Sequence, residues 1–176
     1  MDALALLKTQ HEEVKALFEE IEETEDSDDK LALFEELADA FAAHAAIEEQ
    51  IFYPAAYASA TEELLAEAVE EHLAAKRTLA DLLKMSPDDE QFDAKVKVLK
   101  EQIDHHVEEE EGQLFPKARA QLDQSTLETL GAQMEEMYEA EMEEGPADKI
   151  PLETKKAPAI KPRKPGKGGG KRQPAH

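Results

Sequence analysis

Two stretches of the sequence carry histidine, glutamate and proline in the same order and at the same spacing. They read HAAIEEQIFYP from His44 and HVEEEEGQLFP from His106, so that glutamate follows each histidine by four residues and proline by ten. Another histidine precedes each stretch, His11 by 33 residues and His72 by 34. A single histidine–glutamate pair is common in a chain with so many glutamates, so the repeat of the whole pattern is the informative observation.

The repeated residue types are those that bind metal ions. Residues four apart lie on one face of a helix, so each histidine–glutamate pair presents an imidazole and a carboxylate to one point. The chain has no cysteine, which excludes disulfides, zinc–thiolate sites, iron–sulfur clusters and cysteine nucleophiles. Nitrogen and oxygen ligands suit iron, manganese or zinc, and carboxylates that can bridge favour two ions. The candidate metal ligands are His11, His44, Glu48, His72, His106 and Glu110.

Helices must position these side chains. Ala, Glu, Leu and Lys dominate the chain before Gly145, where glycine is rare, and this composition favours helix. Apolar residues recur at steps of three and four, which is typical of amphipathic helices that share one core. We expect the first helix to end at the acidic run 25–29 and later helices to start at the capping signals Ser27, Thr61, Ser86–Pro87 and Ser125 with Glu128.

These patterns predict an all-α fold. Four helices joined by short loops make an up-down-up-down four-helix bundle, which we assign to residues 1–120. An additional helix over residues 121–144 has a narrower apolar stripe and is expected to pack on the outside of the bundle. Residues 145–176 form a tail.

The candidate ligands, together with Lys76, occupy positions that the periodicity assigns to the core. Burying an unpaired polar group costs about 1–3 kcal/mol, and a bare carboxylate costs more, so these groups require compensation. With a rise of about 1.5 Å per residue, antiparallel helices bring the four histidines to a common height. We predict one polar layer in which metal binding supplies the compensation. The alternative is a closed hydrogen-bond network without metal.

Two residues near this layer have two interpretations each. His105 rivals His106 as a ligand, but it lies about 100° from the apolar seam and is expected to face solvent or to lie outside the ligands. Lys76 either extends its ammonium to the edge of the bundle or lies beside the metals and hydrogen-bonds a ligand.

The aromatic and acidic residues next to the motifs also have two interpretations each. Tyr53 and Phe115 hold equivalent positions, where packing is the expected role and a phenol beside the ligands is the alternative. The acidic runs around the motifs are expected to be mainly solvated, with Glu49 or Glu109 as the source of an extra carboxylate.

Charge divides the chain into two parts. The formal net charge is −22, yet residues 145–176 hold nine Lys and Arg against two Asp and Glu. An acidic body repels phosphate, so we expect no nucleic-acid binding through the bundle. The tail is rich in Pro, Gly and Lys and is predicted to be disordered, either as a solubilising segment or as a contact for an acidic partner or nucleic acid. The chain shows neither an apolar run of membrane-spanning length nor a signal-peptide pattern, so the expected location is cytoplasmic.

The repeated motif resembles the signature of the hemerythrin-like family, specifically its HHE cation-binding domains: a histidine, then H-x3-E with an aromatic–proline end, given twice. The resemblance covers roughly residues 3–120. It implies a non-haem di-iron centre held by the six candidate ligands, with two iron ions bridged by carboxylate and by oxide or hydroxide. The ligand types alone leave manganese or zinc open. Oxygen-carrying hemerythrins have a fifth histidine where this chain has Lys76, which argues against simple reversible oxygen carriage.

Three functional hypotheses follow. The first is a di-iron protein that binds O2, nitric oxide or peroxide for sensing, storage or protection against oxidative or nitrosative stress, because a site with fewer protein ligands leaves positions for a small ligand. The second is a di-iron oxidoreductase that decomposes peroxide or reduces nitric oxide at the same site. The third is a metal-free helical protein that acts through interactions.

Overall fold

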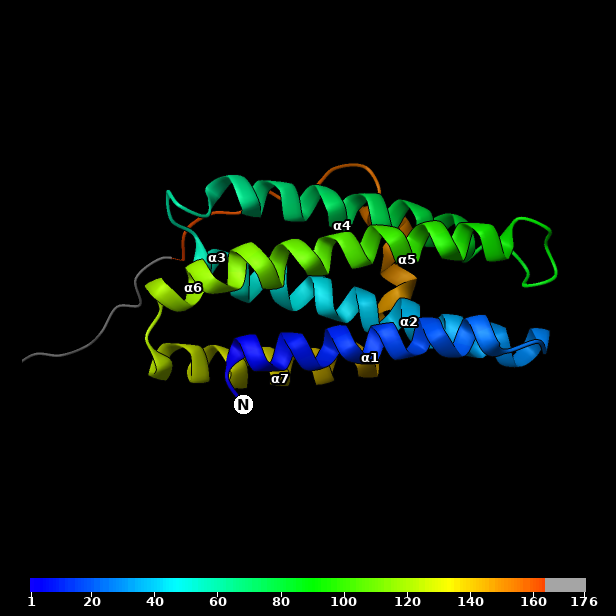
Figure 1. Ribbon diagram of the computed structural model, residues 1–176, viewed down its shortest axis with the longest axis horizontal. Coiled ribbons are helices and arrows are strands. Elements are labelled where there is room, and N and C mark those ends of the chain that lie inside the picture. The colour runs from blue at the N-terminus through cyan, green and yellow to red at the C-terminus, as the bar shows by residue number, and fades with distance from the viewer. Residues whose placement is uncertain (164–176) are drawn as a thin grey trace, which may run out of the picture.

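Four long helices form the body of the protein. The computed structural model describes residues 1–163 and contains only helices, turns and coil in that range. The long helices are α1 (Ala3–Glu23), α2 (Ser27–Ile47), α4 (Glu62–Leu82) and α5 (Phe92–Glu109), and they run along the long axis of the molecule (Figure 1). The predicted all-α bundle is therefore confirmed. Within the described residues, no helix is both long and apolar enough to cross a membrane.

Both helices that carry an H-x3-E motif continue through a wider, π-helical turn. In the first half, η1 (Glu48–Phe52) leads into α3 (Tyr53–Ala56), and in the second, η2 (Glu110–Leu114) leads into α6 (Phe115–Gln121). The backbone N–H of Tyr53 donates to the carbonyl of Glu48, and that of Phe115 donates to the carbonyl of Glu110. A proline follows immediately in each case. Because proline has no N–H and its ring clashes with the carbonyl four residues before it, a change of helical hydrogen bonding is expected there.

An outer helix covers one side of the bundle. Helix α7 (Gln124–Glu144) packs against α1 and α2, as the sequence predicts for the additional helix (Figure 1). Its Leu127, Leu130 and Met134 are buried. Gly131 faces the first residues of the chain, where a Cβ would lie 2.9 Å from the backbone nitrogen of Ala3. Only glycine therefore allows α7 to approach α1 this closely.

The predicted helix starts lie in the right regions of the chain, but several helices begin at, or are capped by, residues other than the predicted ones. The second helix is capped by Asp26, whose carboxylate accepts from the N–H groups of Asp28 and Asp29, and Ser27 is already helical. Helix α5 begins at Phe92, because Ser86–Pro87 opens a series of turns instead. Helix α7 is capped by Asp123, two residues before the predicted Ser125. An aspartate at each of two starts competes successfully with the nearby serine for the cap position.

The prediction of disorder from residue 145 is wrong for residues 146–163, which we call the C-terminal strap. Gly145, at φ 67°, ends α7 in the left-handed conformation, and the chain turns back into the 3₁₀ helix η3 (Pro146–Glu153). Ile150 of η3 is fully buried in the core. The backbone N–H of Arg163 donates to the carbonyl of Pro54 at 2.9 Å. Average composition misses a segment that docks through a few apolar residues, such as the buried Ile150 and the half-buried Ile160. Residues 164–176 lie outside the described residues.

The core consists of two apolar clusters. One cluster includes Val14, Phe41 and Ile103 and extends to the end of the bundle where the chain passes from α1 to α2. The other includes Leu7 and Phe115 and extends to the opposite end of the bundle. In α1 and α4 the candidate ligand lies between the residues of the two clusters, and in α2 and α5 it lies near the end of the first cluster. The fold therefore holds a polar layer across an otherwise apolar bundle.

Candidate metal centre

The polar layer contains all six predicted ligands. They come from six elements, one from each of α1, α2, η1, α4, α5 and η2: His11, His44, Glu48, His72, His106 and Glu110. None is more than 6% exposed. We call these six side chains the inner cluster. Lys76, the seventh polar residue of the predicted seam, is also buried.

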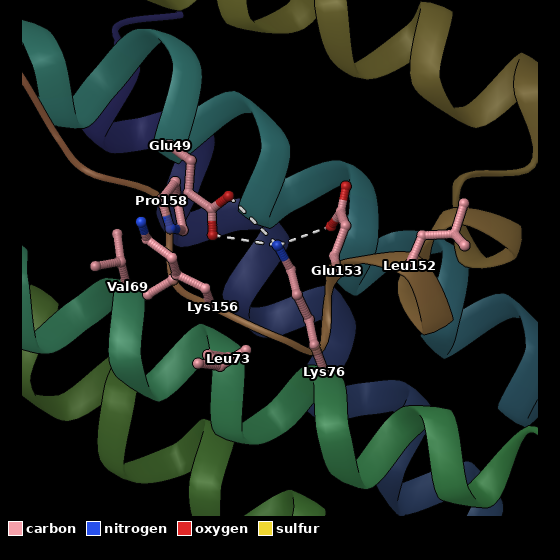
Figure 2. Close-up of a pocket in the computed structure, with 9 residues that line it drawn as sticks. Glu49, Val69, Leu73, Lys76, Leu152, Glu153, Lys156 and Pro158 are labelled. Carbon is pink, nitrogen blue, oxygen red and sulfur yellow. Dashed lines mark hydrogen bonds and ion pairs between the residues drawn. The ribbon is translucent and has the colours of Figure 1, made fainter.

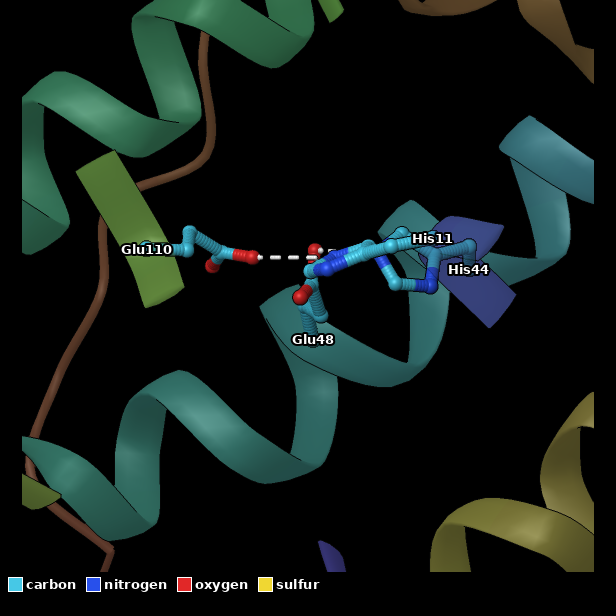
Figure 3. Close-up of side chains that lie close together, drawn as sticks. All are labelled: His11, His44, Glu48 and Glu110. Atoms are coloured by element: carbon cyan, nitrogen blue, oxygen red, sulfur yellow. Dashed lines mark ion pairs between the residues drawn. The ribbon is translucent and has the colours of Figure 1, made fainter. Parts of the chain in front are cut away.

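The inner cluster divides into two groups of ligand atoms that share Glu48. In the first, atoms of His11, His44, Glu48 and Glu110 all lie within 4.8 Å of one another, and in the second, atoms of Glu48, His72 and His106 do so. Figure 3 shows the first group, with the imidazoles and carboxylates pointing toward one another. The Nε2 atoms of His44 and His72 lie 3.3 and 3.1 Å from the same oxygen, Oε2 of Glu48. Glu48 thus belongs to both groups, and Oε2 of Glu110, in the first group, lies 3.6 Å from Nε2 of His106 in the second.

Each imidazole is held from outside by a hydrogen bond at Nδ1. His11 bonds Glu111 (2.8 Å), His44 bonds Gln10 (2.7 Å), His72 bonds Glu49 (2.9 Å) and His106 bonds Glu71 (2.8 Å). We call Gln10, Glu49, Glu71 and Glu111 the outer partners. Because an amide or carboxylate oxygen accepts, Nδ1 donates, and Nε2 points into the cluster. Such partners fix the tautomer and orientation of a metal-binding histidine.

The outer partners obey the same repeat as the ligands. In both halves, the residue just before the first histidine (Gln10, Glu71) holds the second histidine of its own half. The residue just after the glutamate (Glu49, Glu111) holds the first histidine of the other half. The sequence indicates Glu49 only as a source of an extra carboxylate and does not indicate Gln10, Glu71 or Glu111 as partners of the histidines. Their adjacency to the ligands in both repeats was the available signal.

The inner cluster lacks the hydrogen bonds that a metal-free network would need. Among residues 1–163, four buried atoms have no hydrogen-bond partner: Nε2 of His11, Nε2 of His44, Oε1 of Glu48 and Oε2 of Glu110. His11 Nε2 lies 3.4 Å from Glu110 Oε2, but without hydrogen-bond geometry. Buried polar atoms are rarely left unpaired. Converging nitrogen and oxygen atoms with free lone pairs fit a pair of metal ions.

The electrostatics of the metal-free cluster follow from burial and close charge. Burial alone raises the pKa of the Glu48 carboxyl, but the charge on His44 and the close approach of His106, His44 and His72 lower it well below its usual value. Burial alone lowers the pKa of the His106 ring, but the charge of Glu110, the nearby Glu48 and the hydrogen bond to Glu71 raise it well above its usual value. His72 and His106 face each other at 3.1 Å between their Nε2 atoms, so one ring must carry a second proton for this contact to be a hydrogen bond.

Tyr53 is the one aromatic side chain whose polar atom enters the inner cluster. Its hydroxyl donates to Glu110 Oε1 at 2.7 Å, and it lies 3.2 Å from Glu48 Oε2. Burial and the charges of Glu110 and Glu48 raise the pKa of the phenol well above its usual value, so it stays a donor. The equivalent Phe115 stacks on His11, with ring centroids 6.0 Å apart. The alternative interpretation of Tyr53, a phenol beside the ligands, is the one that the structure shows.

Lys76 reaches the edge of the bundle. Its ammonium lies 3.3 Å from both oxygens of Glu49 and 2.9 Å from Glu153 on η3 (Figure 2). It therefore contacts an outer partner of the cluster and the C-terminal strap. A pocket beside this ion pair is lined by Val69, Leu73 and Leu152 among others. The place of the fifth hemerythrin histidine is thus filled by a side chain that turns away from the inner cluster.

His105 and His106 are separated by the structure. His106 belongs to the inner cluster, whereas the side chain of His105 is 61% exposed and lies 3.3 Å from Glu71. The expectation that His105 faces solvent is therefore met, and His106 as the metal ligand stays a prediction.

Comparison with known proteins identifies the family. The chain matches the model of the hemerythrin HHE cation binding domain over residues 2–118. The protein belongs to the hemerythrin HHE family. The matched residues include the whole inner cluster, so this HHE domain carries a buried histidine–glutamate group of the kind that binds cations.

A solved structure resembles the HHE protein beyond the family-matched residues. It is the crystal structure of a hemerythrin HHE cation binding domain-containing protein from Mycobacterium kansasii, whose sequence is 29% identical to this chain. The two structures superpose with a TM-score of 0.70, and the match covers 88% of this chain and 94% of that one. The likeness therefore extends past residue 118. Among curated proteins, no sequence matches this chain.

Proposed function

We propose that this HHE protein holds two iron ions in the inner cluster and uses them to bind O2, nitric oxide or peroxide. The observation that carries the proposal is the set of four buried atoms without hydrogen-bond partners, in a layer where every imidazole is held with Nε2 inward. His11, His44, Glu48 and Glu110 would hold one ion, and Glu48, His72 and His106 the other. Bound iron supplies redox chemistry and open coordination positions for a small ligand.

The chain's own residues prepare the site for such a ligand. The outer partners orient the four rings, and the two apolar clusters on either side keep bulk water away from the polar layer. The Tyr53 hydroxyl is a fixed hydrogen-bond donor between the carboxylates of Glu48 and Glu110. A groove between α1 and α5, lined by His11, Phe18, Ile103 and Val107 among others, reaches the cluster from the surface. Small molecules have a direct approach along it.

Metal titration tests the proposal. Metal-free protein is reconstituted with Fe²⁺, Mn²⁺ or Zn²⁺, and bound metal is counted by elemental analysis together with the ultraviolet–visible spectrum and the melting temperature. We expect two tightly bound irons per chain and a higher melting temperature, and we expect His72→Ala to lose at least one ion. His105→Ala, beside a ligand but outside the inner cluster, should keep both. Folded protein that takes up no iron would overturn the proposal and favour the metal-free interaction protein.

A second candidate function is chemical conversion of peroxide or nitric oxide. The turn of Lys76 toward Glu49 and Glu153 favours it, because the site keeps four histidines and two glutamates and so leaves more positions for a reacting molecule. Repeated consumption of peroxide or nitric oxide by iron-loaded protein, lost in His72→Ala, would establish turnover. Stoichiometric binding without consumption would leave the first function.

A further inference from the structure

A second group of metal-ligating side chains lies on the surface between α4 and α5. Glu71, His105 and Glu109, which we call the surface triad, each have a ligand atom within 4.8 Å of the others. His105 Nε2 lies 3.3 Å from Glu71 Oε1 and 3.9 Å from Glu109 Oε1. The imidazole is exposed, whereas the side chains of Glu71 and Glu109 are only 17% and 25% exposed. An approaching cation thus meets a histidine above two half-buried carboxylates.

The surface triad is connected to the inner cluster through Glu71. While Oε1 of this carboxylate faces His105, its Oε2 accepts a hydrogen bond from His106 Nδ1 at 2.8 Å. One side chain therefore belongs both to the surface triad and to the outer partners.

A narrow gap gives the triad a second connection to the core. It lies between α4 and the α5–η2 junction and is lined by Leu64, Ala68, Glu71, Glu109, Glu110 and Leu114. Glu110 is only 2% exposed, and its Oε2 has no hydrogen-bond partner among residues 1–163. Two carboxylates of the triad and one carboxylate of the inner cluster, with one of its two oxygens unpartnered, thus line one gap.

The triad does not follow from the internal repeat. The positions equivalent to Glu71, His105 and Glu109 in the first half are occupied by Gln10, Ala43 and Ile47. Ala43 and Ile47 are buried, on the helix that α7 covers. All three ligand side chains of the triad are therefore specific to the second half of the repeat.

The other approach to the inner cluster is less suited to a cation. The α1–α5 groove reaches His11 and is lined by Glu12, Asp104 and Glu108 beside Lys15. Among residues 1–163, however, its acidic side chains form no group of three ligand atoms close to one another. Its Glu111 is already engaged, by His11 at 2.8 Å and by Lys8 at 3.7 Å. The surface triad and its gap are thus the better route for a cation, and the α1–α5 groove is the better route for a small neutral ligand.

We propose that the surface triad binds a divalent cation and passes it through the α4–α5 gap to Glu110. Imidazole and carboxylate ligands suit Fe²⁺ or Mn²⁺. The delivery role rests on the proposed function, because it requires an inner cluster that takes up metal. Binding at the surface does not require it.

Mn²⁺ and the double variant His105→Ala/Glu109→Gln test both parts. Electron paramagnetic resonance counts Mn²⁺ bound by protein whose inner cluster is already filled, and stopped-flow tyrosine fluorescence follows filling of metal-free protein, because Tyr53 touches the cluster and the chain has no tryptophan. We expect one additional weakly held Mn²⁺ that the double variant loses. We also expect filling at low micromolar Mn²⁺ to slow at least tenfold in the double variant, with the final number of inner ions unchanged.

Glu108→Gln is the matched control, since it removes one acidic charge from the α1–α5 groove on the same helix. Equal slowing in Glu108→Gln, equal filling rates in wild type and double variant, or no additional Mn²⁺ in the wild type would each overturn the proposal. An inner cluster that takes no metal, beside a surface Mn²⁺ that the double variant loses, would support the surface site and overturn both delivery and the proposed function.

Discussion

At the residue scale, Tyr53 breaks the equivalence of the two halves. The repeat places an aromatic residue before each proline, but only the first has a hydroxyl, and it donates to a glutamate of the other half. The two carboxylates of the inner cluster are therefore unequal. The Tyr53 hydroxyl lies 2.7 Å from Glu110 Oε1 but 3.2 Å from Glu48 Oε2, while the other oxygen of each carboxylate has no partner among residues 1–163.

Tyr53→Phe should destabilise the metal-free protein by about 1–3 kcal/mol, because it leaves a buried carboxylate oxygen without its donor. Urea unfolding of metal-free protein measures the change in the free energy of unfolding. Tyr57→Phe, one turn later and half-buried, should cost much less. Equal effects of the two substitutions would show that the Tyr53 hydroxyl does not stabilise the inner cluster.

The stabilising effect of metal should grow with pH. The pKa of Glu48 is lowered below 4.5, so its contribution to metal-free stability is present above that pH and is lost as the pH falls further. The pKa of His106 is raised above 6.5, so its contribution is present below pH 6.5 and is lost as the pH rises through the raised value. The metal-free protein therefore gains most from these two groups between pH 4.5 and 6.5.

Metal has the opposite preference, because it binds neutral imidazole and displaces the proton. We expect the difference in melting temperature between metal-loaded and metal-free protein to increase steadily from about pH 6 to pH 8. Calorimetry in buffers of different ionisation enthalpy should show protons released on loading. A difference that stays constant over this range would contradict the protonated state inferred for the His72–His106 contact.

The sequence predicts the inner cluster better than its surroundings. His44 and Glu48 stand out because polar residues at seam positions conflict with the apolar periodicity. Outer partners such as Gln10 and Glu111 cause no such conflict, because they do not fall on the seam positions that the periodicity marks, although Gln10 is buried in the structure. Their role depends on side-chain direction across helices, which spacing along one helix does not give.

At the element scale, the two π-helical turns place consecutive glutamates in different roles. Each turn begins at the inner glutamate, and the next residue reaches a histidine of the other half. The two prolines mark these turns in the sequence, but a proline is compatible with a bend in the helix, with its end or with a wider helical turn. The position of each turn was therefore predictable, and its type was not.

A substitution at Gly131 tests how closely α7 packs on the first residues of the chain. Gly131→Ala adds a Cβ that meets the backbone of Met1 and Ala3. We expect a net loss of stability, because overpacking of about 1–3 kcal/mol exceeds the gain in helix propensity of up to about 1 kcal/mol. Gly112→Ala, with nothing within 4 Å of the new Cβ, is the control and should not destabilise. A Gly131→Ala protein as stable as this control would show that α7 shifts freely on α1.

At the scale of the whole molecule, the polar layer is enclosed by more than the four-helix bundle. Periodicity predicts the bundle because each long helix repeats its apolar pattern over several turns. The C-terminal strap has too few apolar residues for any period, and its docking depends on single contacts such as Ile150 in the core and Glu153 on Lys76. Through Lys76 and Glu49, these contacts reach His72 of the inner cluster.

Docking of the strap should therefore depend on Ile150. Ile150→Ala removes a fully buried side chain from the core and should cost about 2–5 kcal/mol in the free energy of unfolding. Leu152→Ala, in the same 3₁₀ helix but 82% exposed, should cost less than about 0.5 kcal/mol. Limited proteolysis separates local from global loss: faster cleavage within 146–163 while the helices stay intact is the expected pattern for Ile150→Ala. Equal protection in both variants would mean that polar contacts, such as the Arg163–Pro54 hydrogen bond, hold the strap by themselves.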